Sequence, residues 1–240
     1  MWQFDTSVLE IMARTRDIKT FRFDAGGHEV QYNAGQYFYV TIKVGGQQAE
    51  HHFTISSSPT ETEESHYLEF TKRITSSDYS QALDRMKPGD WARLEGPEGE
   101  FTLPSSNDSL AFISGGIGIT PLRSMMRYTL DKGLKHDIVL VYGNNLWDNI
   151  AFREELDEMA SSNKDIRVEY VLSGPDFPPE WKGKRGFITK EVIRDLVPDY
   201  LGRTFYLSGP MAMVLSLEDQ LFGMNIPQEQ MKRDYFPGYD

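Results

Sequence analysis

Cysteine is absent from this sequence of 240 residues. Its absence excludes disulfide bonds, and it also excludes every zinc or iron–sulfur site that needs thiolate ligands. The five histidines are scattered apart from the adjacent pair His51 and His52, and their spacing matches no metal-binding motif. We therefore expect no metal site. Electron transfer by this chain would need an organic cofactor or a haem.

Positive charge is scarce as well. The sequence has 25 lysines and arginines but 36 aspartates and glutamates, which gives a net charge of −11. This balance argues against nucleic-acid binding, which needs clustered Lys and Arg. Long apolar runs are also missing, and the longest, such as Ile138–Tyr142, have the length of a strand rather than a membrane span. The N-terminal residues 1–6 have neither the basic nor the apolar region of a signal peptide. We expect a soluble, cytoplasmic protein without a membrane span.

The first hundred residues have the sequence pattern of an all-β domain. Short runs that mix aromatic, β-branched and polar residues are separated by turns such as Gly45-Gly46. The expected strands cover residues 20–24, 36–44 and 67–73. The helical spacing of Ala82, Leu83 and Met86 predicts one helix over residues 80–87. Short strands with regularly spaced turns predict a closed antiparallel β-barrel.

The second half alternates between apolar strands and helices. We expect strands at residues 110–114, 137–142, 167–173 and 204–208, followed in turn by helices at residues 121–132, 150–161, 189–196 and 211–223. This alternation predicts an α/β domain with a parallel sheet, the architecture of nucleotide-binding domains. The two halves join in the polar stretch 103–108. We therefore expect a β-barrel domain at residues 1–104 and an α/β domain at residues 105–240.

A glycine-rich stretch, residues 114–121, follows the first strand of the second half and opens its first helix. Gly115, Gly116 and Gly118 allow the backbone to approach a ligand, and N–H groups at the helix start attract the pyrophosphate of a dinucleotide. Thr120 is expected to cap this helix, and Pro121 is expected at its first position. Pro121 stands where the G-x-G-x-x-G fingerprint has its third glycine, which weakens an ordinary Rossmann interpretation. A turn that binds no ligand is the alternative.

A second loop, Ser208-Gly209-Pro210, also lies between an expected strand and an expected helix. The carboxyl ends of parallel strands lie at one edge of a sheet, and ligands bind at that edge. We therefore expect both loops there. By itself, this short loop is also explained as a capped helix start.

Four segments that occur in order resemble the motifs of one protein family. Residues 51–57, His-His-Phe-Thr-Ile-Ser-Ser, resemble a flavin-binding Arg-x-Tyr-Ser/Thr segment, and residues 96–101 resemble the Gly-Pro-x-Gly-x-Phe turn that ends a flavin domain. Residues 115–121 resemble a nicotinamide pyrophosphate loop, and residues 208–210 resemble a Cys-Gly-Pro loop near the nicotinamide. Over nearly its whole length, the chain is thus similar to the compact two-domain flavoprotein reductases of the ferredoxin–NADP reductase superfamily.

The resemblance implies FAD in the first domain. It assigns flavin contacts to His51, Phe53, Thr54, Ile55 and Ser56, and ribityl and pyrophosphate contacts to Thr71, Lys72, Arg73, Tyr79 and Ser80. Thr54 is implied near the flavin N5. His51 stands where the family often has an arginine, and a largely uncharged histidine weakens the clamp on the phosphate. A solvated basic pair is the alternative for Lys72 and Arg73.

The resemblance also implies a nicotinamide dinucleotide, NADH or NADPH, in the second domain. It assigns contacts to Gly115, Gly116, Gly118, Thr120, Pro121, Asn144, Asn145, Gly209 and Pro210. The two asparagines carry no charge for a 2′-phosphate, which mildly favours NADH, although Arg153 or Arg185 could still reach one. In the C-terminal tail, Phe236 or Tyr239 is implied over the flavin ring, and the alternative is that these aromatics only hold the terminus.

The implied activity is that of an FAD-dependent oxidoreductase, with Thr54, Ser208 and Phe236 next to the hydride transfer. Electrons would pass between NAD(P)H and a ferredoxin, a flavodoxin or a similar carrier. An electron-transfer subunit of a larger complex and a reductase of free flavin or ferric compounds remain alternatives. A basic patch could steer an acidic carrier, and its expected members are Arg14, Arg16, Lys19 and Arg22, with Arg85 and Lys87 elsewhere in the first domain. The acceptor and the oligomeric state stay open.

Overall fold

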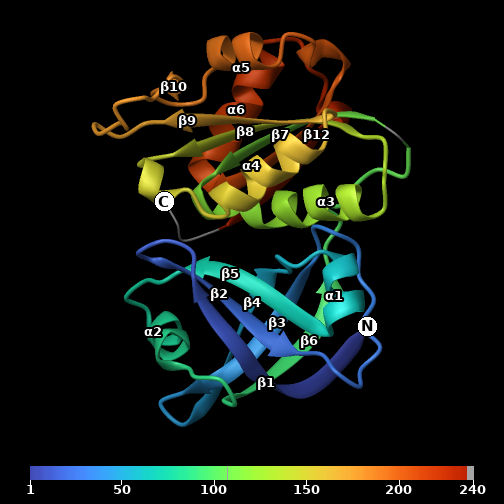
Figure 1. Ribbon diagram of the computed structural model, residues 1–240, viewed down its shortest axis with the longest axis vertical. Coiled ribbons are helices and arrows are strands. Elements are labelled where there is room, and N and C mark those ends of the chain that lie inside the picture. The colour runs from blue at the N-terminus through green and yellow to red at the C-terminus, as the bar shows by residue number, and fades with distance from the viewer. Residues whose placement is uncertain (107, 237–240) are drawn as a thin grey trace. The chain divides into compact units, whose positions relative to one another are not determined.

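The computed structural model describes residues 1–106 and 108–236 (Figure 1). By its internal contacts the chain divides into two compact units. The first consists of Met1–Leu103 together with Arg123–Tyr128, and the second of Pro104–Leu122 together with Thr129–Asp240. The two units have different architectures, so each is described by itself.

The first unit contains a six-stranded antiparallel sheet that curves into a barrel (Figure 1). Its strands are β1 (Trp2–Ala13), β2 (Ile18–Asp24), β3 (Tyr37–Val44), β4 (Gln47–Thr54), β5 (Tyr67–Arg73) and β6 (Trp91–Glu98), in the order β4-β3-β6-β1-β2-β5. After β4, the Ser56 N–H donates to the Glu69 carbonyl of β5 at 2.8 Å, which joins the two ends of the sheet. The antiparallel barrel predicted from the sequence is confirmed.

Aromatic side chains fill the barrel. Phe21, Phe38 and Phe70 are completely buried, and the rings of Phe21 and Phe70 stack with their centroids 5.2 Å apart. These residues come from three different strands, so their packing fixes the register of strands that are far apart in the sequence. Burying large aromatic side chains supplies much of the hydrophobic stabilisation of such a domain.

Two short helices flank the barrel. Helix α1 (Pro59–Ser65) was not expected from the sequence, and a capping box between Ser58 and Glu61 starts it. Arg123, which belongs to the first unit, donates to both carboxylate oxygens of Glu61. Burial alone would raise the pKa of Glu61, but its hydrogen bonds with Arg123 and the charge of that residue hold the pKa below its usual value.

Helix α2 (Asp78–Arg85) lies two residues upstream of the range 80–87 expected from the sequence. The hydroxyl of Ser77 accepts a hydrogen bond from the Ser80 N–H at 3.3 Å and so caps the helix at its start. At the other end, Met86 leaves the helical conformation, with a ψ of 154°. The helix therefore ends before the turn of residues 87–90 begins.

The second unit contains a six-stranded sheet in which every strand pair that the structure describes is parallel. Its strands are β7 (Ser109–Gly115), β8 (Asp137–Asn144), β9 (Ile166–Leu172), β10 (Lys184–Arg185), β11 (Thr204–Pro210) and β12 (Met231–Phe236), in the order β10-β9-β8-β7-β11-β12. The helices are α3 (Ile119–Asp131), α4 (Arg153–Ser162), α5 (Lys190–Leu196) and α6 (Met211–Phe222), and residues 123–128 of α3 belong to the first unit. This confirms the predicted α/β architecture. The edge strands β10 and β12 were not expected.

The central strands of this sheet are apolar almost throughout. In β7 every residue after Ser109 is buried, and the β8 residues Ile138–Tyr142 are buried as well. Figure 1 shows α5 and α6 on one side of the sheet and α4 on the other, which accounts for strands buried on both faces. Among the described residues, no helix combines the length and the hydrophobicity that crossing a membrane requires.

Candidate functional site

In the first unit, the end of β4 presents the residues to which the resemblance assigns the flavin ring. His51 is exposed, Phe53 is half-buried and Thr54 is buried. The Phe53 ring stacks on Phe70 with the centroids 4.1 Å apart, so the barrel core fixes its orientation. The ring of His51 lies 4.3 Å from that of Tyr79. Burial and the nearby charge of Lys72 lower the pKa of His51, so this histidine is neutral at physiological pH.

Three further assigned residues support this strand from within the barrel. Ile55 is completely buried. The Ser56 hydroxyl lies 3.1 Å from the Thr71 hydroxyl, which in turn lies 2.7 Å from the hydroxyl of Thr20. The side chains of Ser56 and Thr71 thus bond within the protein. What they contribute to a ligand is the position of the backbone between β4 and β5.

Lys72 and Ser80, which are assigned to the pyrophosphate, are brought together by the fold. The Lys72 ammonium donates to the Ser80 hydroxyl at 3.3 Å and to the Arg73 carbonyl at 2.9 Å. Lys72 is only 6% exposed, and burial lowers its pKa to about 8. It is therefore a buried cation and not part of a solvated pair. Arg73 instead forms an ion pair with Asp17 at 3.1 Å.

Tyr79 has a structural role, because it is buried and bonded within the barrel. Its hydroxyl donates to the Val40 carbonyl at 2.6 Å, and its side chain is buried in the barrel core. The bond ties α2 to β3. Through the contact of its ring with His51, Tyr79 lines the same surface as the end of β4.

In the second unit, the two glycine loops that the sequence singled out touch each other. A Cβ atom on Gly118 would lie 2.3 Å from the Ser208 carbonyl oxygen and 2.6 Å from the Gly209 Cα. A Cβ atom on Gly115 would lie 2.3 Å from the Met213 sulfur. Gly116 has a φ of 54°, in the left-handed region. Backbone therefore packs on backbone where β7 and β11 end, and Gly118 is required for this approach.

The expected roles of Thr120 and Pro121 at the helix start are wrong. A 3₁₀ turn, Gly116–Gly118, leads directly into α3, which begins at Ile119. The Thr120 hydroxyl donates to the Ile117 carbonyl at 3.3 Å and does not accept from a helix N–H, and Pro121 is the third helical residue. The glycine turn starts the helix earlier than the capping pattern indicated. Both residues still lie in the first turn, beside the glycines.

Buried polar atoms without protein partners gather at this edge of the sheet. Ser114 and Ser208 are adjacent in register on β7 and β11, and both are completely buried. Within residues 1–106 and 108–236, neither of their hydroxyls nor the Nδ2 of Asn144 has a hydrogen-bond partner. Buried polar groups are almost always satisfied, so a polar ligand or an ordered water at this edge would bond these atoms. The amide and hydroxyl groups of a dinucleotide fit this requirement.

Asp234 is a residue at this edge that sequence reasoning missed. It lies next to Ser208 in the pairing of β11 with β12, and burial raises its pKa to about 6. The tail was interpreted as a cover for a ring and not as a strand, so no partner strand was considered. Phe236, from the same tail, ends β12 opposite Pro210. Tyr239 lies outside the described residues.

The end of β8 carries the two asparagines assigned to the adenosine. The carbonyls of Asn144 and Asn145 accept from the N–H groups of Ser173 and Gly174, at 2.9 and 2.8 Å, which fixes this turn against the segment after β9. The Arg153 guanidinium lies over the Trp147 ring, 4.5 Å from its centroid. Arg185 lies in the same way over Phe177, at 4.4 Å. Both arginines are thus held against aromatic rings.

The contact of Gly118 with Ser208 predicts a strong effect of one added methyl group. We expect Gly118→Ala to lower the free energy of unfolding by about 3 kcal/mol, because its Cβ would overlap a backbone carbonyl that has no room to move. Thermal unfolding checks this. Gly202→Ala is the matched control, since a Cβ there meets nothing within 4 Å and should leave the melting temperature almost unchanged. Equal melting temperatures for the two variants would contradict the packing argument.

The raised pKa of Asp234 predicts a pH-dependent stability. In the unfolded chain an aspartate titrates near 3.9, and in the fold Asp234 titrates at about 6. Between these values the folded state binds more protons, so the free energy of unfolding falls as the pH rises from about 4 to about 6. We expect Asp234→Asn to be more stable than the parent by about 2 kcal/mol above about pH 7, and to match it near about pH 4.

Thermal melts across this pH range measure the effect of Asp234→Asn. Asp176→Asn, which changes the charge of an exposed residue, is the control and should produce no such difference. A stabilisation of Asp234→Asn that is the same at both ends of the range would show that the carboxyl is not buried as a charge.

Comparison with known proteins assigns a family to each half. The model of the oxidoreductase FAD-binding domain matches residues 6–103, and the model of the oxidoreductase NAD-binding domain matches residues 112–219. The glycine betaine monooxygenase reductase subunit of Pseudomonas aeruginosa is 27% identical over 232 residues, which are 95% of this chain and 63% of that protein. Ferredoxin–NADP reductase B of Sorangium cellulosum is 28% identical over 191 residues, with 79% and 77% of the two chains covered.

Solved structures show the same fold. The flavohem-like FAD/NAD-binding domain of nitric oxide dioxygenase from Vibrio cholerae matches with a TM-score of 0.85 at 19% identity, over 97% of this chain and 98% of that one. The chain spans less than two thirds of several curated relatives, for example 63% of the Pseudomonas reductase subunit. Both family models match in the order that the barrel and the parallel sheet require. Together the two family models match most of the chain, which therefore belongs to the ferredoxin–NADP reductase superfamily.

Proposed function

We propose that the protein is an FAD-dependent oxidoreductase that transfers electrons between NADH or NADPH and an external one-electron carrier. One observation carries the proposal. A single chain joins a flavin-domain barrel, in which the buried Lys72 ammonium donates to the Ser80 hydroxyl, to a nicotinamide-domain sheet. Within the described residues, the edge of that sheet holds polar atoms without hydrogen-bond partners. We also propose that the two domains divide at residues 104 and 105. The cytoplasmic location stays a prediction from the sequence.

In the first domain, the proposed FAD contacts follow the chemistry of the groups present. The Lys72 ammonium and the start of α2 near Ser80 offer positive charge and N–H groups to a pyrophosphate. His51, being neutral, offers a hydrogen bond and a ring face but little charge. Phe53 and Thr54, at the end of β4, offer an apolar face and a hydroxyl for the flavin ring. When bound, FAD supplies hydride and single-electron chemistry that no side chain of the protein has.

In the second domain, the glycine loops are proposed to hold the dinucleotide. Gly115, Gly116 and Gly118 bring the backbone close to the ligand, and the 3₁₀ turn and the start of α3 direct N–H groups toward its phosphates. Ser208, whose hydroxyl is buried and unpartnered within the described residues, is proposed to orient the nicotinamide. With Thr54 and Phe236, it completes the set proposed for hydride transfer. NADH remains mildly favoured, because Asn144 and Asn145 are neutral.

The external partner is proposed to be a ferredoxin, a flavodoxin or a similar carrier. The names of two relatives, a ferredoxin–NADP reductase and an oxygenase reductase subunit, support a carrier protein. The basic patch expected in the first strands does not support it. Lys19 pairs with Asp84 at 2.7 Å, and Arg22 pairs with both Glu10 and Glu69, so much of its charge is neutralised within the barrel.

Two alternative functions predict different results in turnover assays. A reductase subunit of a larger complex would bind FAD and oxidise a nicotinamide, but it would reduce a carrier only with its other subunits present. A reductase of free flavin or ferric compounds would release its flavin readily and reduce small acceptors without a carrier. Turnover assays with each acceptor distinguish these possibilities.

Anaerobic titration tests the main proposal. We expect the purified protein to be yellow, or to become yellow with added FAD, and the flavin absorbance to bleach on addition of NADH or NADPH. Comparing the two nucleotides at equal concentration gives the preference, and NADH is expected to bleach the flavin at the lower concentration. A folded protein that takes up neither FAD nor FMN would overturn the proposal.

The buried Lys72 predicts how FAD affinity depends on pH. In the free protein the pKa of Lys72 is lowered by burial to about 8, and a bound pyrophosphate would raise it again by attracting the proton. FAD binding therefore takes up a proton above about pH 8, so its affinity should fall as the pH rises, by up to about tenfold per unit. Flavin fluorescence titrations at several pH values measure this.

Lys72→Met separates this effect from other titrations. We expect the variant to bind FAD more weakly at neutral pH and to lose the fall in affinity above about pH 8. Lys87→Met removes an exposed lysine from the same domain and should keep the pH dependence of the parent. If Lys72→Met keeps that dependence, another group is responsible and Lys72 does not contact the phosphates.

A further inference from the structure

The chain segment that follows β4 is held in place by side chains from another part of the first unit. Residues 55–58 lie between β4 and α1, outside the strands of the barrel. The Ser56 N–H is bonded to the barrel, since it donates to the Glu69 carbonyl at 2.8 Å. The carbonyls of Ser56 and Ser57 accept hydrogen bonds from side chains. The conformation of the segment therefore depends on donors that lie outside it.

Arg123 makes the first of these contacts. It lies in the part of α3 that belongs to the first unit, and it is only 3% exposed. Its Nη1 donates to the Ser56 carbonyl at 2.9 Å, and its two Nη atoms also donate to the two carboxylate oxygens of Glu61. Glu61 in turn accepts from the Ser58 N–H at 2.7 Å. The planar guanidinium thus bonds the segment directly at Ser56 and, through Glu61, at Ser58.

Ser124, the next residue of α3, makes the second contact. It is completely buried, and its hydroxyl donates to the Ser57 carbonyl at 2.7 Å. The Tyr32 hydroxyl donates to the same carbonyl at 3.0 Å. A carbonyl oxygen has two lone pairs, so both bonds can form together. Side-chain donors therefore fix two successive carbonyls of the segment.

These carbonyls belong to the part of the chain to which flavin contacts are assigned. Because a peptide unit is planar, a donor that fixes the Ser56 carbonyl also fixes the direction of the Ser57 N–H. The bond from Ser124 fixes the next peptide unit in the same way. A ligand site works only when its contacts are held within about 0.5 Å of the productive geometry. The donors on α3 therefore control how the end of this segment is presented to a ligand.

We propose that Arg123 and Ser124 are positioning residues of the flavin site, which hold the backbone of residues 56–58 so that Thr54 and Ser56 present fixed groups to FAD. The inference rests on the proposed function, because it takes FAD as the ligand of this segment. Neither residue is among the contacts that the resemblance implies. Residues 1–104 thus do not contain the complete flavin site, since two residues that shape it lie on α3.

Titration of the full-length protein, stripped of flavin, with FAD tests the proposal by flavin fluorescence. Ser124→Ala leaves the Ser57 carbonyl its bond from Tyr32, so we expect this variant to fold and to bind FAD about fivefold more weakly than the parent. Arg123→Lys keeps a positive charge beside Glu61, but one ammonium cannot reproduce the fork that bonds Ser56 and Glu61 together. We expect it to bind FAD about tenfold more weakly.

Visible circular dichroism of the bound flavin, recorded at saturating FAD, separates positioning from stability. This signal depends on the contacts of the flavin ring with the protein. Both variants should therefore change it, whereas a substitution that only destabilises the fold should not. Thermal melts of the same samples give the stability of each variant.

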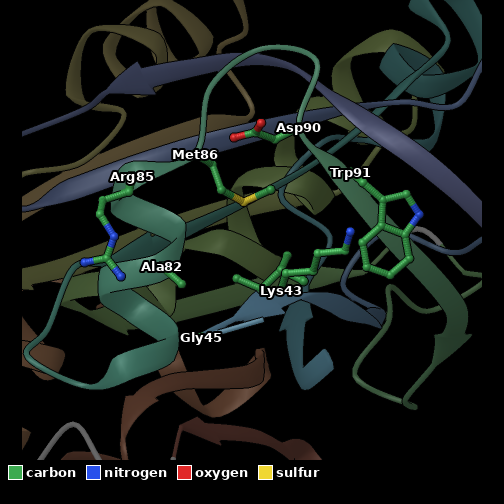
Figure 2. Close-up of a pocket in the computed structure, with 8 residues that line it drawn as sticks. Lys43, Gly45, Ala82, Arg85, Met86, Asp90 and Trp91 are labelled. Atoms are coloured by element: carbon green, nitrogen blue, oxygen red, sulfur yellow. The ribbon is translucent and has the colours of Figure 1, made fainter. Parts of the chain in front are cut away.

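Asp90→Ala is the matched control. Like Ser124, Asp90 makes a bond from its side chain to the backbone, because its carboxylate accepts from the Lys87 N–H at 2.8 Å. Asp90 lines a cavity with Met86 and Trp91, and no residue proposed to contact FAD lines this cavity (Figure 2). We expect Asp90→Ala to lower the melting temperature and to leave both the FAD affinity and the flavin spectrum unchanged.

Two results would overturn the positioning role. The first is that Ser124→Ala and Arg123→Lys bind FAD with the affinity and the spectrum of the parent, whatever their melting temperatures. The second is that Asp90→Ala has the same effects as these variants, which would attribute the loss to stability alone. Ser124→Ala decides the outcome if Arg123→Lys does not fold. A parent protein that binds neither FAD nor FMN would instead overturn the proposed function, and this inference with it.

Discussion

The second domain depends on the direct contact of two loops, in which the backbone at Gly118 lies against the Ser208 carbonyl. Because no side chain separates them, the 3₁₀ turn and the first residues of α3 lie at the edge where β7 and β11 end. The same closeness buries the hydroxyls of Ser114 and Ser208 away from water. Desolvated groups without protein partners cost free energy in the empty site, and a polar ligand that bonds them recovers that cost. The glycines thus allow a ligand to approach the backbone closely, and the contact they permit buries the hydroxyls that a ligand would bond.

The sequence predicted most of what depends on local pattern. The strands β7 and β8 are continuous apolar runs, and the glycine loop that follows β7 carries its own backbone requirement, so both could be located without a structure. The 12-residue strand β1 was missed because only Phe4 and Val8 of its side chains are buried, which gives no regular alternation. Asp234 was missed for a different reason. Its environment comes from the pairing of β12 with β11, a long-range contact that no local pattern records.

The start of helix α3 shows how tertiary structure overrides a local signal. Thr120 followed by Pro121 is a good capping sequence, yet the helix begins upstream at Ile119. Tyr142 explains part of this, because its hydroxyl donates to the Gly116 carbonyl at 2.8 Å and holds the turn in place from the neighbouring strand. A hydrogen bond from β8 thus stabilises a conformation that the loop sequence alone does not specify. Capping preferences amount to about 1 kcal/mol, which a hydrogen bond to a fixed strand can offset.

The barrel holds positive charge in two different settings, in ion pairs on its strands and in the buried side chain of Lys72. A net charge of −11 repels anions at long range, but salt screens that repulsion beyond about 8 Å under physiological conditions. At shorter range, what matters is whether a cation already has a carboxylate beside it. Arg22, Arg73 and Arg93 on the barrel strands each have one, and Lys72 is buried next to Ser80 near the start of α2. The ion pairs of Arg22, Arg73 and Arg93 therefore neutralise much of the positive charge on the barrel strands, and Lys72 places a buried positive charge beside the residues proposed to bind FAD.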